Sequence, residues 1–218
     1  LPGVPFVSGD NLIIWQETAL VNGPNFDMES QLWLLRLIKE TKTPLLFGTL
    51  DATLKEKETP KTKKGAFRYF NAAMFVQTDG EFAPVYHKLH LVPFGEYVPF
   101  ESWFPWMRFL TPIPGSFDSG KDAICFDFKG IKLGPLICFE DIFPHLSRNL
   151  NGMGANLLVN LTNDAWFKKS PGAAMHLANA VFRAIENRRP LVRCANHGIT
   201  CIVDPMGRIG RQHLLNPF

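Results

Sequence analysis

The sequence predicts an α/β domain with a mixed sheet, and three observations lead to this prediction. Apolar runs typical of buried strands alternate along the chain with segments of helical periodicity. Two turn signals, Thr78-Asp79-Gly80 and Lys129-Gly130, each separate strand-like segments as in a hairpin, which makes part of the sheet antiparallel. The chain has 218 residues, of which 46% are hydrophobic, enough for a thick core. We therefore expect residues 1–218 to form a single domain.

The first elements are predicted as a strand, a helix and a second strand. Residues 11–16 form a short apolar run typical of a strand that is covered on both faces. Residues 28–40 carry apolar side chains at helical spacing and leave their charged residues for solvent. Residues 45–50 form another apolar run. This order predicts a parallel crossover unit.

The middle of the chain is predicted as a loop followed by two hairpins. Residues 51–65 are polar and rich in lysine, so we expect a solvated loop, with a contact to anionic lipid as the alternative. Residues 67–77 and 81–87 flank the first turn signal, and residues 123–128 and 131–138 flank the second. Each pair is predicted to form an antiparallel hairpin.

The last third of the chain again alternates helices with strands. Residues 144–151 predict a short helix, and residues 172–189 predict a long amphipathic helix that Pro190 ends. The strands predicted in this part are residues 155–161, 191–195 and 199–204.

Composition and spacing exclude several classes of function. The 23 Lys and Arg against 20 Asp and Glu give a net charge of +3, too small and too dispersed for a nucleic-acid surface. No window approaches 18 consecutive apolar residues, so no transmembrane segment is expected. The cysteines fit neither a disulfide framework nor a zinc site, and His87-x-x-His90 lacks a third ligand. We expect free thiols, no metal and no cofactor.

Charged and nucleophilic side chains in apolar surroundings are the candidates for chemistry. Lys88 and Glu96 lie in the apolar, proline-braced loop 86–99. Glu17 ends the run Ile-Ile-Trp-Gln, and Cys138 ends another apolar strand just before a predicted turn and helix. A buried charge is costly unless it is paired or used. Each residue also has an ordinary interpretation: a carboxylate reaching solvent, a surface lysine and an inert core thiol.

Taken together and in this chain order, Glu17, Lys88 and Cys138 resemble the catalytic set of the nitrilase superfamily. The run 88–99, Lys-Leu-His-Leu-Val-Pro-Phe-Gly-Glu-Tyr-Val-Pro, resembles the apolipoprotein N-acyltransferase family in particular. The resemblance implies a nitrilase-type α-β-β-α sandwich with mixed sheets. It also implies that membrane helices precede the domain. We expect residues 1–218 to be a piece of a longer protein, truncated at both ends.

The resemblance implies a role for each member of the set. Glu17 is the general base, and Cys138 is the nucleophile that forms a thioester. Lys88 and the backbone N–H of Phe139 bind the oxyanion of the tetrahedral intermediate. Glu96 is expected to orient Lys88 and the active-site loop, or only to anchor that loop.

Further residues match the family's motifs. Glu140 belongs to a Cys-Phe-Glu segment where the family has Cys-Tyr-Glu, so the tyrosine hydroxyl is missing. Asn71 and Trp166 match family segments, and we expect both to contact substrate, with ordinary core packing as the alternative for Trp166. Gln16 and Lys168 stand where proline and glycine are common, so the loop geometry there is expected to differ.

The function implied by the resemblance is acyl transfer at the periplasmic side of the bacterial inner membrane. The acyl donor is a phospholipid, and the acceptor is the diacylglyceryl-cysteine of an apolipoprotein. The apolar segment 103–110 is either core or an arm that enters the membrane surface. Two alternatives remain for the function: a soluble nitrilase-type amidase acting on a small amide, and a non-catalytic module that binds lipid or protein.

Overall fold

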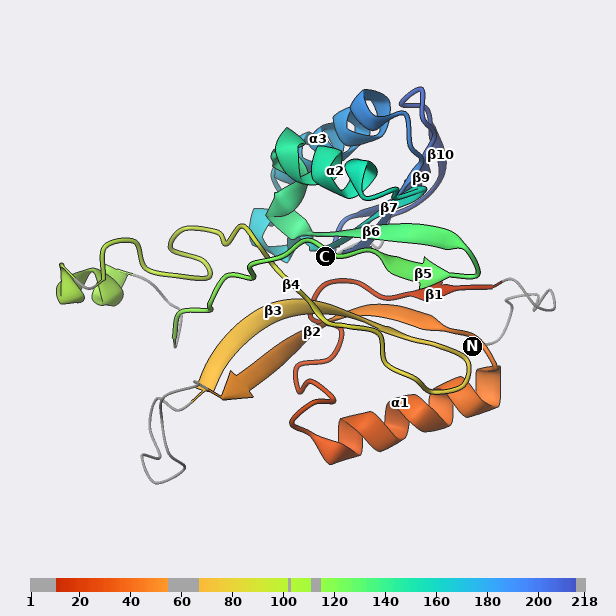
Figure 1. The fold of residues 1–218 in the computed structure, drawn as a ribbon. Helices are drawn as coiled ribbons and strands as arrows, with labels where there is room; N and C mark the ends of the chain where they lie inside the picture. The colour runs from red at the N-terminus through yellow and green to blue at the C-terminus, as the bar shows by residue number, and fades with distance from the viewer. Residues whose placement is uncertain (1–10, 55–66, 102, 111–114, 215–218) are drawn as a thin grey trace.

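The protein consists of two β-sheets packed face to face with helices on both outer sides (Figure 1). The computed structural model describes residues 11–54, 67–101, 103–110 and 115–214. The smaller sheet has four strands in the order β1-β2-β3-β4, and the larger has six in the order β10-β9-β8-β7-β6-β5. Both sheets mix parallel and antiparallel neighbours. The expected α-β-β-α sandwich with mixed sheets is confirmed.

The smaller sheet and its helix come from the first part of the chain. Its elements are β1 (Ile13–Ile14), α1 (Met28–Thr41), β2 (Leu45–Leu54), β3 (Phe67–Val76) and β4 (Tyr86–His87). Helix α1 begins where it does because the Asp27 carboxylate accepts a hydrogen bond from the Ser30 N–H, which caps the first turn. The helix then packs Leu34 and Ile38 against the outer face of the sheet.

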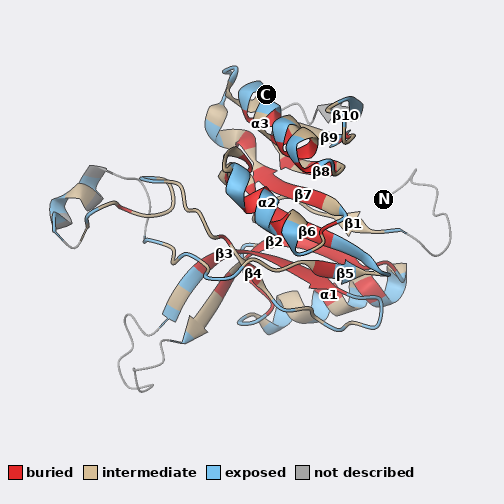
Figure 2. Cartoon of the chain, turned by 45° about the horizontal axis from the view of Figure 1, so that its top comes forward, coloured by how far each residue is buried: buried red, intermediate tan, exposed pale blue. Residues whose placement is uncertain are grey.

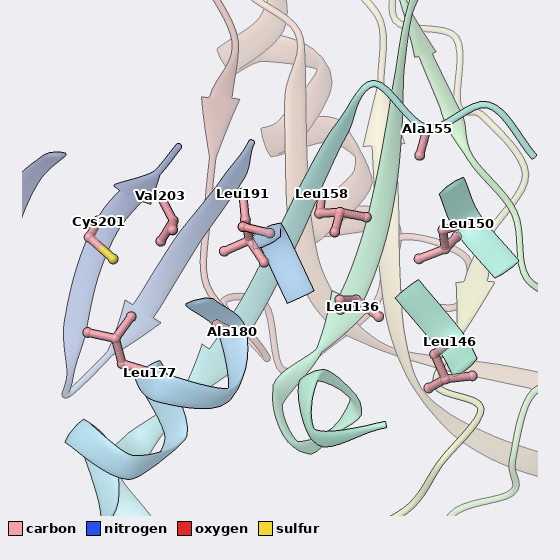
Figure 3. Packing of buried hydrophobic residues seen from close by; sticks show 11 residues of the cluster. Leu136, Leu146, Leu150, Ala155, Leu158, Leu177, Ala180, Leu191, Cys201 and Val203 are labelled. Atoms are coloured by element: carbon pink, nitrogen blue, oxygen red, sulfur yellow. The ribbon is translucent and has the colours of Figure 1, made fainter. Parts of the chain in front are cut away.

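The larger sheet and its two helices come from the rest of the chain. Its elements are β5 (Phe126–Phe128), β6 (Ile131–Ile137), α2 (Pro144–Gly152), β7 (Leu157–Asn163), α3 (Gly172–Asn187), β8 (Leu191–Asn196), β9 (Ile199–Val203) and β10 (Ile209–Leu214). Strands β6, β7 and β8 are parallel, and the others pair antiparallel. Helices α2 and α3 cover the outer face, where Leu177 and Ala180 pack near Leu191 and Val203 (Figure 3). Figure 2 shows that the buried residues gather in the middle of the sheets, while the outer faces of the helices are exposed.

The space between the sheets holds the central core. Phe75 of β3 and Leu46 of β2 pack there against Leu133, Ile137 and other buried residues of the larger sheet. Two parallel strands end at this layer in short 3-10 helices, η2 (Cys138–Ile142) after β6 and η3 (Asp164–Phe167) after β7. Ligand sites of α/β proteins lie at the carboxyl ends of parallel strands, so these two ends are where a site is expected.

The predicted loop 51–65 is wrong at its beginning, because β2 continues to Leu54. Asp51 is 1% exposed in this strand, which the polar character of the segment concealed. Its carboxylate is satisfied by the Asn25 Nδ2, 2.9 Å away, and by the His87 Nε2, 2.6 Å away. The remainder of the predicted loop lies outside the described residues.

The first hairpin is present but much shorter than predicted. Only β4 pairs as a strand with β3, and before it a single bridge joins Val76 to Phe82. Pro84 lies inside the predicted strand 81–87 and has no N–H for a ladder hydrogen bond, which explains the break. The second hairpin joins β5 to β6 as predicted, although β5 begins only at Phe126.

The segment 103–110 is not core. Trp103 is 78% exposed and Phe109 is 91% exposed. The 3-10 helix η1 (Pro105–Leu110) stands away from the sandwich at the end of an extended excursion of the chain (Figures 1 and 2). The core interpretation is therefore wrong, and the interpretation as an arm for the membrane surface stays a prediction.

Candidate active site

Cys138 lies at a sharp turn where β6 ends and η2 begins. Its φ angle is +49°, in the left-handed region that side chains other than glycine rarely adopt. Such a conformation costs about 1–3 kcal/mol and persists only where the surrounding structure imposes it. A strained strand-to-helix turn presents a nucleophilic side chain at the edge of a sheet. The Cys138 side chain is accordingly half-buried at the layer between the two sheets.

Lys88 lies directly after β4, with only 1% of its surface exposed. Its Nζ is 2.8 Å from Glu96 Oε1 and 3.5 Å from Glu17 Oε1, and Glu17 itself is 6% exposed. Burial alone lowers the pKa of Lys88, but the negative charges of Glu17 and Glu96, and that of Cys138 once its thiol is ionised, outweigh it and raise that pKa. Lys88 therefore stays positively charged. The ordinary interpretations, a surface lysine at Lys88 and a carboxylate reaching solvent at Glu17, are wrong because both side chains are buried.

The thiol of Cys138 is protonated at neutral pH. Burial raises its pKa to about 12, together with the charges of Glu17 and Glu96, while Lys88 and a hydrogen bond with Thr162 act in the opposite direction. The thiol thus senses the charges of both Glu17 and Lys88, which come from distant parts of the chain. A protonated thiol is a poor nucleophile, so any attack by this sulfur needs a base to remove its proton.

Asn71 lies on β3 between the two carboxylates. Its Nδ2 donates to Glu17 Oε1 and to Glu96 Oε1, both at 2.8 Å. Because carboxylates only accept hydrogen bonds, the amide nitrogen must face them. Asn71 Oδ1 is then left buried and without a hydrogen-bond partner among the described residues. That oxygen is an acceptor available to a bound molecule.

Glu17 is held from the larger sheet as well. Its Oε2 accepts a hydrogen bond of 2.9 Å from the backbone N–H of Asn163, the last residue of β7. Sequence reasoning did not find this contact, since no side-chain pattern marks a backbone donor.

Glu96 closes the loop that follows Lys88. Its Oε2 accepts from the Val92 N–H at 2.8 Å, and its own N–H donates to the Val92 carbonyl. Its Oε1 meets Lys88 and Asn71. Glu96 therefore anchors the loop and contacts the lysine at the same time, so both interpretations of this residue agree with the geometry.

Glu140 joins the two sheets beneath the site. It is fully buried, and its oxygens accept from the backbone N–H groups of Leu89, His90 and Ile137 and from the hydroxyl of Tyr86. Burial raises the pKa of Glu140, and these hydrogen bonds oppose that effect. The carboxylate fixes the segment after Lys88 relative to the turn at Cys138.

The comparisons with known proteins identify the family. The sequence model of the carbon-nitrogen hydrolase family matches residues 8–213. This chain belongs to the carbon-nitrogen hydrolase family. Solved members share its fold: a carbon-nitrogen hydrolase from Helicobacter pylori G27 gives a TM-score of 0.69 at 17% identity, covering 94% of this chain and 74% of that one. The amidase from Nesterenkonia sp. AN1, in a form with a substituted cysteine, gives 0.66 at 17% identity, covering 95% and 74%.

Relatives with higher sequence identity carry a more specific name. An apolipoprotein N-acyltransferase from Geobacter metallireducens is 39% identical over 202 residues, which is 91% of this chain and 37% of the relative. Enzymes of the same name from Treponema denticola and Rickettsia prowazekii are 35% and 36% identical, covering 95% and 94% of this chain. The chain spans only 41% and 40% of those two proteins.

An apolar cavity of about 840 Å³ lies beside the turn at Cys138 in this carbon-nitrogen hydrolase. Its lining is mostly apolar and includes Leu89, Leu91, Pro93, Phe139, Ile142 and Phe143. The Phe139 ring meets Phe143 edge to face, with 5.4 Å between their centroids, so ring packing persists at the position where the family has tyrosine.

Trp166 is the predicted site residue that the described contacts do not join to the others. It lies on η3 and is 69% exposed, so the core interpretation is wrong. Its role as a substrate contact stays a prediction.

In the described part of the chain, no cluster of three or more histidine, cysteine or acidic side chains could hold a metal, and no helix is long and apolar enough to cross a membrane. All four cysteines are free thiols.

Sequence reasoning missed a second buried charged cluster behind the site. It consists of Asp141, Asp164, His176 and Arg193, each at most 5% exposed. The signal that pointed to Glu17, a charged residue among apolar neighbours, was present at Arg193 too.

Proposed function

We propose that residues 1–218 form the catalytic domain of an N-acyltransferase that moves an acyl chain from a phospholipid to the N-terminal diacylglyceryl-cysteine of an apolipoprotein. The names of the relatives and the run 88–99 support the substrate class. The observation that carries the chemistry is a buried lysine, paired with Glu17 and Glu96, whose charge acts on a cysteine at a strained turn.

In the first half-reaction, Glu17 accepts the proton of the Cys138 thiol, and the sulfur attacks the ester carbonyl carbon of the phospholipid. The negative charge that develops on the carbonyl oxygen is stabilised by Lys88 and by the Phe139 N–H. The carbon–oxygen bond to the glycerol then breaks, and the departing oxygen takes the proton from Glu17. A lysophospholipid leaves, and Cys138 carries a thioester.

In the second half-reaction, the α-amino group of the lipoprotein attacks the thioester carbonyl. Glu17 accepts a proton from this amine, and the same two donors stabilise the oxyanion. The carbon–sulfur bond breaks, an amide remains on the lipoprotein, and the Cys138 sulfur recovers the proton. The unpaired Asn71 Oδ1 is available to accept a hydrogen bond from the incoming amine.

The electrostatics of the pocket suit this proton movement. At rest the pocket holds one cation, Lys88, and two carboxylates, Glu17 and Glu96. When the proton passes from Cys138 to Glu17, negative charge moves from the carboxylate to the sulfur and then to the oxyanion. The net charge of this buried site stays constant throughout, which avoids the cost of burying a further charge.

The surroundings of the site suit a lipid substrate. The apolar cavity beside Phe139 fits an acyl chain. The exposed aromatic residues of the arm, among them Trp103, Trp106 and Phe109, favour the interface of a bilayer. We propose that this arm contacts the membrane and that the domain faces the periplasm, where the lipoprotein substrates are.

Mass spectrometry tests this function directly. The protein is mixed with phosphatidylethanolamine vesicles, and the peptide containing Cys138 is examined for an added acyl mass. We expect an adduct that an amine acceptor removes and that Cys138→Ala lacks. An adduct that survives Cys138→Ala contradicts the proposal. Ammonia release from small amides without lipid would instead support the amidase alternative, and no modification by either substrate class would support a non-catalytic binding module.

A further inference from the structure

The peptide group between Cys138 and Phe139 is held from its carbonyl side. The Cys138 carbonyl oxygen accepts hydrogen bonds from Asn160 Nδ2 on β7 and from His176 Nε2 on α3, both at 3.2 Å. The described chain contains no cis peptide bond, so this group is trans and its C=O and N–H point in opposite directions. Whatever fixes the carbonyl therefore also fixes the Phe139 N–H, the proposed oxyanion donor.

The two groups that hold the carbonyl are themselves held by charges. Asn160 Oδ1 accepts from an Arg193 guanidinium nitrogen at 2.7 Å. His176 Nδ1 lies 2.9 Å from Asp164 Oδ1, and its Nε2 lies 3.0 Å from Asp141 Oδ1. Arg193 also pairs with both aspartates, at 3.2 Å and 2.8 Å. These contacts leave Asn160 and His176 little freedom to move away from the carbonyl.

His176 is a cation in this cluster. Burial and the neighbouring Arg193 lower its pKa, but the carboxylates of Asp141 and Asp164 outweigh them and raise the pKa to about 9. Both ring nitrogens of a protonated histidine are donors. A charged donor on a carbonyl oxygen polarises the peptide group, and hydrogen-bond chains in a low-dielectric interior strengthen one another in this way.

We propose that His176, together with Asn160, is a positioning residue that orients and polarises the Cys138–Phe139 peptide so that its N–H binds the oxyanion. The inference rests on the proposed use of Cys138 as a nucleophile. His176 touches no substrate in this scheme: it acts only through the peptide group.

The test compares a reaction that forms an oxyanion with one that does not. Acylation of Cys138 by a soluble ester, p-nitrophenyl butyrate, needs the oxyanion donor, whereas alkylation by iodoacetamide forms no oxyanion. For His176→Gln we expect the maximal acylation rate to fall about tenfold, part of the 10²–10³ that removal of a whole oxyanion donor costs. In the same variant, the ester concentration for half saturation and the alkylation rate of the Cys138 peptide stay within about threefold of the wild-type values.

Two matched controls lie on the same helix. Met175→Gln introduces the same side chain at the neighbouring position, which is 69% exposed, and leaves both rates unchanged. Leu177→Ala removes a core side chain of α3 (Figure 3) and lowers stability without touching the carbonyl. If His176→Gln does not fold, Asn160→Ala removes the other donor to the carbonyl and is expected to show the same split between acylation and alkylation.

Each outcome separates the inference from the function. Acylation that falls while alkylation stays constant supports the positioning role, even if phospholipid never acylates the wild-type protein and the lipid function is thereby rejected. Acylation that is unchanged in His176→Gln overturns the inference while Cys138 remains the nucleophile. Acylation and alkylation that fall together also overturn it, because His176 then supports the whole turn and not the N–H.

Discussion

Two buried charged clusters lie on either side of the turn at Cys138, and they differ in charge balance. The cluster in front of it has one cation, Lys88, against two carboxylates, Glu17 and Glu96, so its net charge is negative. The cluster behind it sets Arg193 and a protonated His176 against two aspartates, so its charges cancel. The proposed mechanism uses the charge imbalance of the front cluster to move a proton, and it uses the balanced rear cluster only to hold a peptide group in place.

The largest expected effect is in the front cluster. Glu17→Gln removes the proposed base from beside a thiol whose pKa is about 12, so acylation of Cys138 by phospholipid should fall by about 10²–10⁴. Single-turnover mass spectrometry of the Cys138 peptide measures the rate. Glu81→Gln makes the same change at an exposed position and should leave the rate as it was. Adduct formation at the wild-type rate in Glu17→Gln would remove Glu17 from the mechanism.

A substitution in the rear cluster should lower the free energy of unfolding. Arg193→Met leaves Asp141 and Asp164 buried without their main cation, and breaking a buried ion pair in this way costs about 3–5 kcal/mol. Urea unfolding measures the loss. Arg68→Met is the matched control, because Arg68 pairs with Asp118 at the surface and the loss should stay below about 1 kcal/mol. Equal losses in the two variants would contradict the contrast between a buried and a solvated pair.

The protonation of the rear cluster gives a pH dependence. The pKa of His176 is raised from 6.5 to about 9 in the folded protein, so its stabilising contribution is complete below about pH 6.5 and is lost as pH rises through 9. The wild-type protein should lose about 2–3 kcal/mol more than His176→Gln between these values. Unfolding curves from pH 6 to pH 10 for both proteins measure the difference, and parallel curves would show that folding does not raise the pKa of His176.

The smallest expected effect concerns Asn71. Asn71→Ala removes the donor shared by Glu17 and Glu96, so we expect a loss of about 1–2 kcal/mol in stability and about tenfold in acylation. Asn25→Ala removes a comparable donor from the buried Asp51 on the outer face of the smaller sheet. It should cost similar stability and leave acylation intact. A loss of acylation in both variants would mean that stability alone limits the reaction.

The fold class could be predicted from the sequence because the signals for helices, strands and turns are local. Helical spacing in α1 and α3 and the turn at Lys129-Gly130 depend on neighbours within a few residues, and the structure confirms them. The same local signals failed at Asp51, which looked like loop, and at residues 103–110, which looked equally suited to core. In both cases the environment comes from residues far along the chain.

The front cluster was foreseeable and the rear cluster was not. Lys88 and Glu96 stand in one apolar run that matches a family motif, and Glu17 and Cys138 end apolar strands, so each residue carried its own signal. Asp141, Asp164, His176 and Arg193 come from η2, η3, α3 and β8 and stand in no common motif. Only their convergence behind one peptide group supports the positioning role that we propose.

By itself, the sequence determined the alternation of strands and helices and the kinds of side chain that are buried, because periodicity and the cost of buried charge act residue by residue. Only the tertiary structure decided which partners those charges meet: Glu17 with the backbone of Asn163, and His176 with the carbonyl of Cys138. These contacts join residues more than thirty positions apart, and such pairings exist only once the two sheets have packed together.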